Sequence, residues 1–189
     1  MFQKIQEDIM GFIYEYLGQG LIFAFVCMLF LTIGIGIYRK RQGMSGLSFQ
    51  GKMVYKGILL YAFFIYIYMV LGITFFSRKP SKTATVDLKL FHTFADHPTA
   101  KLFIYENILM FVPLGFFTYL LFEKYRKIYV AVFLGFLCSV FIEITQYVTH
   151  LGKLQVDDIF NNVVGMLLGH MMGWVIYRVV YIIHKKTGE

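Results

Sequence analysis

The sequence predicts an all-α, polytopic membrane protein of about five transmembrane helices, with its N-terminus outside and its C-terminus in the cytoplasm. The 189 residues are 58% hydrophobic and 19% aromatic, and the apolar residues occur in long runs. A hydrocarbon core about 30 Å thick needs roughly 20 consecutive apolar residues in a helix, and several runs are that long. Backbone groups in lipid must be paired within the segment, so continuous apolar runs are typical of helices rather than barrels.

The basic residues that flank the apolar runs predict the orientation. We expect spans at about 17–38, 54–76, 104–122, 128–148 and 159–183. The set of flanks that includes 39–53, 123–127 and the C-terminus carries eleven basic residues when Lys56 and Arg178 are included, against seven in the other set. The richer set is expected inside. The net charge of +7 is thereby explained by topology, and we expect no nucleic-acid partner.

We expect a single transmembrane domain over residues 17–189, preceded by a short amphipathic segment over residues 1–16. Apolar residues of this segment follow helical spacing, which suits a helix lying in the membrane interface. They are Phe2, Ile5, Ile9, Phe12 and Tyr16. The first apolar run lacks a cleavage-site pattern, so no removable signal peptide is expected.

Polar residues gather where the predicted spans meet the outer face. A charge at the centre of a bilayer costs roughly 2.5 to 3.5 kcal/mol on insertion scales, so such groups need partners, water or a place near the interface. We therefore expect one outward-facing binding cluster. Its members are Arg78, Glu106, Asn107, Glu143, Gln146, Lys153, Asp157, Asp158 and Asn162.

The fourth span carries a polar stripe. Its residues stand at i, i+3, i+4 and i+7, and therefore on one helical face: Glu143, Gln146, Tyr147 and His150. One interpretation is interhelical hydrogen bonding that fixes packing. The other is a functional site, because an intramembrane acid is a functional candidate by default.

Asp157 and Asp158 open the last span, where an aspartate can cap free N–H groups and meet the positive end of the helix dipole. We expect one of the two to cap only. The other would share a face with Asn162 and form a hydrogen-bonded or ion-binding group. Oxygen ligands suit Mg²⁺ or Ca²⁺, but the spacing matches no recognised cation loop, so no metal or cofactor is expected.

Small residues on two spans predict close helix packing. Gly165, Gly169 and Gly173 form a ladder that lets a neighbouring backbone approach. On the third span, Pro113 removes one backbone hydrogen bond, and Gly115 follows it. We assign all five to packing rather than to binding.

Three blocks between about residues 61 and 174 resemble the VanZ-like family of small bacterial membrane proteins. The blocks are NILMFVPLGF with Asn107, Pro113 and Gly115, IEITQ with Glu143 and Gln146, and DDIFNNVVG with Asp158, Asn162, Gly165 and Gly169. Arg78 also resembles the basic residue that closes the preceding span in this family. The family is named for a factor associated with resistance to the glycopeptide teicoplanin.

The sequence departs from the family pattern at two places. Where the family often carries an arginine ahead of the aspartates, this chain has Gly152 and Lys153, and lysine offers a point charge instead of a planar fork. A loop pattern that contains proline in the family reads Asp87-Leu88-Lys89-Leu90-Phe91 here.

The resemblance implies a multi-pass protein of the bacterial cell membrane with a role in the envelope. The first hypothesis is a non-enzymatic factor that reduces susceptibility to teicoplanin-type antibiotics. Its partners would be membrane lipids, a lipid-linked wall precursor or the lipoglycopeptide itself. The second is a membrane enzyme acting on a phospholipid or polyprenyl-phosphate, with Glu143 or Asp158 as general base and Lys153 or Arg78 on phosphate. No familiar catalytic motif is visible, so we prefer the first.

Overall fold

The computed structural model describes residues 2–41, 51–83, 85–91 and 100–187. Within these residues, five helices are long and apolar enough to cross a membrane, at Tyr14–Tyr38, Val54–Phe76, Lys101–Leu121, Ile128–Val148 and Val156–Ile183. The prediction of an all-α protein with about five spans is confirmed. The predicted ends lie within three residues of the observed ones.

The chain divides into two compact units, residues 1–73 and 74–189. The first unit pairs helix α1 (Phe2–Arg41) with α2 (Gly51–Leu71). At their contact, the Tyr68 hydroxyl donates to Gln19 Oε1 at 2.6 Å, and a Cβ at Gly20 would lie 3.4 Å from the Ile65 side chain. Gly20 therefore lets the two helices approach closely.

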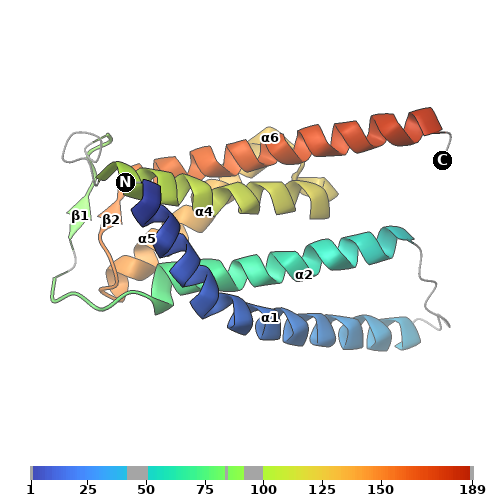
Figure 1. The fold of residues 1–189 in the computed structure, drawn as a ribbon, viewed down its shortest axis with the longest axis horizontal. Helices are drawn as coiled ribbons and strands as arrows, with labels where there is room; N and C mark the ends of the chain where they lie inside the picture. Colours follow the sequence, from blue (N-terminus) through green and yellow to red (C-terminus); the bar gives the residue numbers. More distant parts are fainter. Residues whose placement is uncertain (1, 42–50, 84, 92–99, 188–189) are drawn as a thin grey trace. The chain divides into compact units, whose positions relative to one another are not determined.

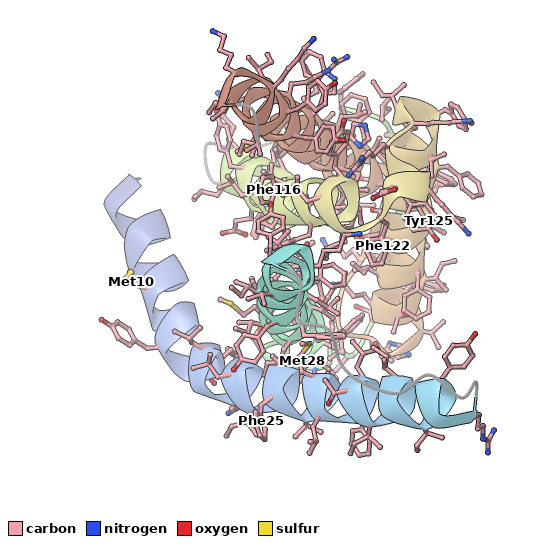
Figure 2. The ribbon with its side chains drawn as sticks, turned by 90° about the vertical axis from the view of Figure 1, so that its right-hand side faces the viewer. Met10, Phe25, Met28, Phe116, Phe122 and Tyr125 are labelled. Carbon is pink, nitrogen blue, oxygen red and sulfur yellow. The ribbon has the colours of Figure 1, made fainter. Side chains whose placement is uncertain are left out.

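Helix α1 is continuous from the N-terminal segment into the first span. Figure 2 shows that its axis bends between Met10 and Phe25. The expected amphipathic start is thus the first part of a long helix. The side chains of Phe2, Ile5, Ile9 and Phe12 lie outside the described residues, so its apolar face stays a prediction.

The second unit contains helices α4 (Ala100–Leu121), α5 (Ile128–Val148) and α6 (Val156–Thr187). The π-helical turn η1 (Gly72–Phe76) completes the second span, and the 3₁₀ turn η2 (Glu123–Tyr125) connects α4 to α5. Figure 1 shows α4 and α6 side by side along much of their length. The two helices run parallel, because α5, which lies between them in the sequence, returns the chain to the end where α4 begins.

The glycine ladder is the contact between α4 and α6. A Cβ added at Gly165 would lie 2.2 Å from the Ile108 carbonyl oxygen, and one at Gly169 would lie 1.8 Å from that of Val112. From the other side, a Cβ at Gly115 would lie 2.1 Å from the Met166 oxygen. The two backbones are therefore in direct contact, as the small-residue pattern predicts.

Helix α5 covers this pair through an apolar core of Phe111, Ala131, Ile142 and Met166. The Met166 side chain fills the space opposite Gly135, where an added Cβ would lie 2.9 Å from it. At the η2 end, Arg126 donates from Nε to the Tyr119 carbonyl at 3.1 Å. Figure 2 labels Phe122 and Tyr125 in this connection, and their ring centroids are 5.7 Å apart.

At the opposite end of this unit, two short strands pair in parallel, β1 (Val86–Asp87) with β2 (Leu154–Gln155). Figure 1 shows them beyond the start of α4 and α6. We call residues 77–91, apart from residue 84, the strap, and residues 149–155 the turn. Ser81 N–H donates to the His150 oxygen at 2.8 Å, and Leu154 N–H to the Thr85 oxygen at 3.1 Å. The strap is therefore bound along the turn that precedes α6.

Many large apolar side chains lie on the outer surface of the helices, among them Phe133, Phe141, Val148 and Val179. Continuous apolar surface of this extent is unfavourable in water but suits the hydrocarbon of a bilayer. In contrast, several of the most buried side chains are polar, including Ser139, Asn161 and Asn162. The protein is a multi-pass membrane protein whose interior holds polar groups.

Candidate functional site

Glu143 and Gln146 on α5 are both 3% exposed and face the strap and turn. Glu143 Oε2 accepts a hydrogen bond of 2.9 Å from the backbone N–H of Gln155. Gln146 donates from Nε2 to the Thr74 carbonyl at 3.1 Å. The π-helical turn that contains Thr74 thus supplies a carbonyl acceptor to α5, and such turns are frequent at functional sites.

Asp158 on α6 lies close enough to Glu143 for their charges to repel one another. The Asn107 side chain on α4 forms a hydrogen bond with the Asp158 carboxylate. The positive charge of Arg78 attracts both carboxylates. We call Arg78, Asn107, Glu143, Gln146 and Asp158 the polar cluster.

Gly152 in the turn locates the guanidinium of the cluster. A Cβ added there would lie 3.0 Å from Gln146 Oε1 and 3.1 Å from Arg78 Nη1. The amide and the guanidinium therefore both pack against Gly152, the one turn residue that has no side chain. Arg78 is exposed, whereas Glu143 is buried and Asp158 is half-buried, so Arg78 is the member of the cluster that is most open to solvent or a ligand.

Asp157 anchors the strap. It is 3% exposed, and its Oδ1 accepts a hydrogen bond from the backbone N–H of Phe91. Phe91 has a left-handed φ of 63°, and its ring packs edge-on against Phe160 with centroids 5.5 Å apart. The two adjacent aspartates thus have different partners, since Asp157 binds the strap and Asp158 binds α4.

A second polar group continues from the cluster into the bundle. Asn162 lies one turn after Asp158 on α6, and Ser139 lies one turn before Glu143 on α5. Asn162 donates from Nδ2 to Ser139 Oγ at 2.8 Å. Asn162 Oδ1 and Asn161 Nδ2 are buried without a hydrogen-bond partner. A buried water bound to these atoms is the usual solution, because unpaired buried polar groups are costly.

Other predicted site residues lie outside this interior. Glu106 and Lys153 are exposed at the same end of the unit. The predicted stripe on α5 is wrong at its last residue, because His150 lies beyond the helix, whereas Tyr147 belongs to the helix and is exposed. His150 adopts φ 58° and Leu151 N–H returns to the Gln146 oxygen at 2.8 Å, a Schellman-type end that replaces the expected last turn.

Sequence reasoning missed Ser139, Thr74 and the backbone of Gln155. Ser139 had a signal, because it stands four residues before Glu143 on the same face of α5. The Thr74 oxygen and the Gln155 N–H are main-chain groups that no residue pattern identifies. Chemically, the cluster combines an exposed guanidinium with shielded carboxylates and amides. This set suits recognition of a polar headgroup or proton transfer by a carboxylate.

Within the described residues, no group of three or more His, Cys, Asp or Glu side chains is arranged to hold a metal ion. The comparisons with known proteins give one match. Residues 58–180 match the family model described as VanZ/LLP1, which spans all three helices of the second unit and the strap. Searches of curated proteins and of solved structures gave no match.

Proposed function

Because the chain belongs to the VanZ-like family, we propose that it is an envelope factor that lowers susceptibility to teicoplanin and related lipid-bearing glycopeptides. In this proposal, the polar cluster engages lipid headgroups or a lipid-linked cell-wall precursor. The observation that carries it is the exposed Arg78 beside two shielded carboxylates, at the end of three membrane-spanning helices. The ends of membrane-spanning helices lie at the depth of the lipid headgroups.

The physical basis is the membrane anchor of the drug. An acyl chain holds a lipid-bearing glycopeptide at the leaflet surface and raises its effective concentration near lipid-linked targets. A protein that binds those targets, or changes the headgroups around them, reduces this advantage. Vancomycin, which lacks such an anchor, should lose less activity.

The test is expression in a susceptible Gram-positive host, with inhibitory concentrations measured for teicoplanin and vancomycin. We expect tolerance to teicoplanin to rise more than tolerance to vancomycin. Glu143→Gln and Asp158→Asn keep size but remove charge and replace one acceptor oxygen by a donor, and each should abolish the effect at equal membrane content. Glu123→Gln makes the same chemical change at the η2 end of the unit, and this variant should still raise tolerance to teicoplanin. Equal concentrations with and without the protein would exclude the proposal.

A membrane enzyme acting on a phospholipid or polyprenyl-phosphate is the second candidate. The observation that favours it is the proximity of Glu143 and Asp158, because one carboxylate could act as general base while Arg78 holds a phosphate. An enzyme changes the lipid pool, whereas a binding factor leaves it intact. Lipid mass spectrometry of cells with and without the protein therefore separates the two functions.

A further inference from the structure

Exposed lysines surround the polar cluster on the strap and the turn. Lys82 follows Ser81, whose N–H is bound to the His150 oxygen at 2.8 Å, and Lys153 directly precedes β2. Lys89 lies just after β1, and its N–H donates to Asp87 Oδ1 at 3.1 Å. Because the register pairs Val86 with Leu154, these segments lie side by side. We call Lys82, Lys89 and Lys153 the lysine rim; all three are exposed.

Most of the acidic residues at this end of the unit are buried or half-buried, in contrast to the exposed lysines. Glu143 and Asp157 are buried, Asp158 is half-buried, and each accepts a hydrogen bond from within the protein. In the described strap and turn, Asp87 is the single acid, and it is half-buried. On α4, Glu106 is an exposed exception. A ligand that approaches over the strap and turn therefore meets mainly positive charge.

The sequence-based topology expects this end outside, where the orientation rule does not require basic residues. Near Arg78, the carboxylates of Glu143 and Asp158 offset the positive charge of its guanidinium. The lysine rim supplies the additional positive charge.

We propose that the ligand of the polar cluster carries phosphate, with Arg78 binding the phosphate oxygens and the lysine rim attracting the anion. This inference rests on the proposed function, which makes the cluster a ligand site. A guanidinium offers a planar fork of donors that matches two phosphate oxygens. The carboxylates of Glu143 and Asp158 attract the Arg78 guanidinium to this end of the helices. The phosphate can belong to a phospholipid, a polyprenyl-phosphate or a soluble anion.

The experiment is calorimetric titration of the full chain in a neutral detergent. The probes are a polyprenyl-phosphate, phosphatidylglycerol and inorganic pyrophosphate, with polyprenol and diacylglycerol as phosphate-free counterparts. We expect the phosphate-bearing lipids to bind at least tenfold more tightly than their counterparts, and salt to weaken that binding. Equal affinity for each phosphate-bearing and phosphate-free pair would overturn the inference. Tighter binding of a lipid than of pyrophosphate identifies a headgroup, and equal binding identifies a soluble phosphate.

Variants test the named groups. Arg78→Lys keeps the charge but removes the fork, and should weaken binding of the phosphate lipids roughly tenfold. Replacing the three rim lysines by Gln should weaken it by roughly tenfold or more and reduce its salt dependence. The matched control replaces Lys124, Lys185 and Lys186, which are exposed and lie outside the cluster, strap and turn. Equal loss in the control, or no loss in the rim variant, would contradict the inference.

The outcomes also separate this inference from the proposed function. Phosphate-selective binding without any difference in glycopeptide tolerance would exclude the proposed function and leave the phosphate site standing. A teicoplanin effect without phosphate selectivity would exclude the phosphate site and leave the envelope role standing. Because the rim residues are exposed, their substitution also keeps the test valid if Arg78→Lys fails to fold.

Discussion

At the scale of single residues, Gly152 explains how a turn can present an arginine. The family resemblance marks this position as a departure, since an arginine is often found nearby. In the structure, the missing side chain leaves room for Arg78 Nη1 and Gln146 Oε1, each of which would lie about 3 Å from a Cβ added to the glycine. The guanidinium therefore comes from the strap rather than from the turn.

Gly152→Ala should displace the Arg78 guanidinium. The new Cβ would meet Nη1 at 3.1 Å and Oε1 at 3.0 Å, closer than ordinary contact, so the flexible arginine must move by a few tenths of an ångström. We expect phosphate-lipid affinity to fall severalfold while the free energy of unfolding changes by less than about 1 kcal/mol. Gly57→Ala, which meets nothing within 4 Å, is the control. Unchanged affinity in Gly152→Ala would show that the guanidinium is not positioned there.

Ser139 and Asn162 make the second residue-scale prediction. Ser139 is completely buried and accepts a hydrogen bond from the side chain of Asn162, whose Oδ1 has no partner. Ser139→Ala should lower the free energy of unfolding by about 1 kcal/mol, because a buried donor loses its acceptor. Thr145→Ala removes a hydroxyl that bonds within its own helix, and should lower the free energy of unfolding by less than Ser139→Ala does. Equal costs in a denaturant titration would contradict this account.

At the scale of elements, backbone contact joins α4 and α6. The Ile108 and Val112 carbonyls lie against Gly165 and Gly169. This contact brings Asn107, directly before Ile108, within hydrogen-bonding reach of Asp158, two turns before Gly165. The polar cluster therefore depends on the glycine ladder, although no ladder residue belongs to it. Contacts of carbonyl oxygens with glycine Cα–H groups add weakly to such packing.

Gly169→Ala should separate these two helices. Its Cβ would lie 1.8 Å from the Val112 oxygen, and backbone cannot move aside as a side chain can. We expect a loss of about 3 kcal/mol or more in the free energy of unfolding, at the upper end for overpacking. Gly57→Ala, in the open on α2, should be neutral or stabilising by up to about 1 kcal/mol. A measured loss below about 1 kcal/mol for Gly169→Ala would refute the contact.

The sequence predicted the helices better than their connections. Spans follow from the length of apolar runs, and the ladder follows from glycines four residues apart, because both are local patterns. The β1–β2 pair was not predicted, since residues 86 and 154 are far apart in the chain and each strand has only two residues. The predicted end of α5 at residue 148 matches the structure, but the polar stripe was wrongly extended to His150, which occupies a left-handed position that usually carries glycine.

The candidate site was predicted in part for the same reason. Periodicity placed Glu143 and Gln146 on one face, and the structure brings them together with Arg78, Asn107 and Asp158. Periodicity could not assign separate partners to Asp157 and Asp158, because their partners Phe91 and Asn107 come from distant segments of the chain. The binding roles of all these residues stay predictions, as does the single domain over residues 17–189.

At the scale of the whole molecule, the topology can be tested by cysteine labelling. We expect the strap and turn to face outside, and η2 and the C-terminus to face the cytoplasm, on the eleven-to-seven count of basic residues. In a background with Cys27 and Cys138 replaced by Ser, an impermeant reagent should label Lys79→Cys but not Tyr125→Cys on intact cells. Labelling of position 125 alone would reverse the topology.

The central claim is that the polar cluster binds a lipid-borne headgroup. Mass spectrometry of lipids that copurify with the full chain, compared with the Glu143→Gln and Asp158→Asn variants, tests it most directly. The account predicts that one class of phosphate-bearing lipid is enriched on the unaltered protein and depleted on both variants, while Glu123→Gln retains it. The same lipid profile on all four proteins, matching that of the surrounding membrane, would contradict the claim.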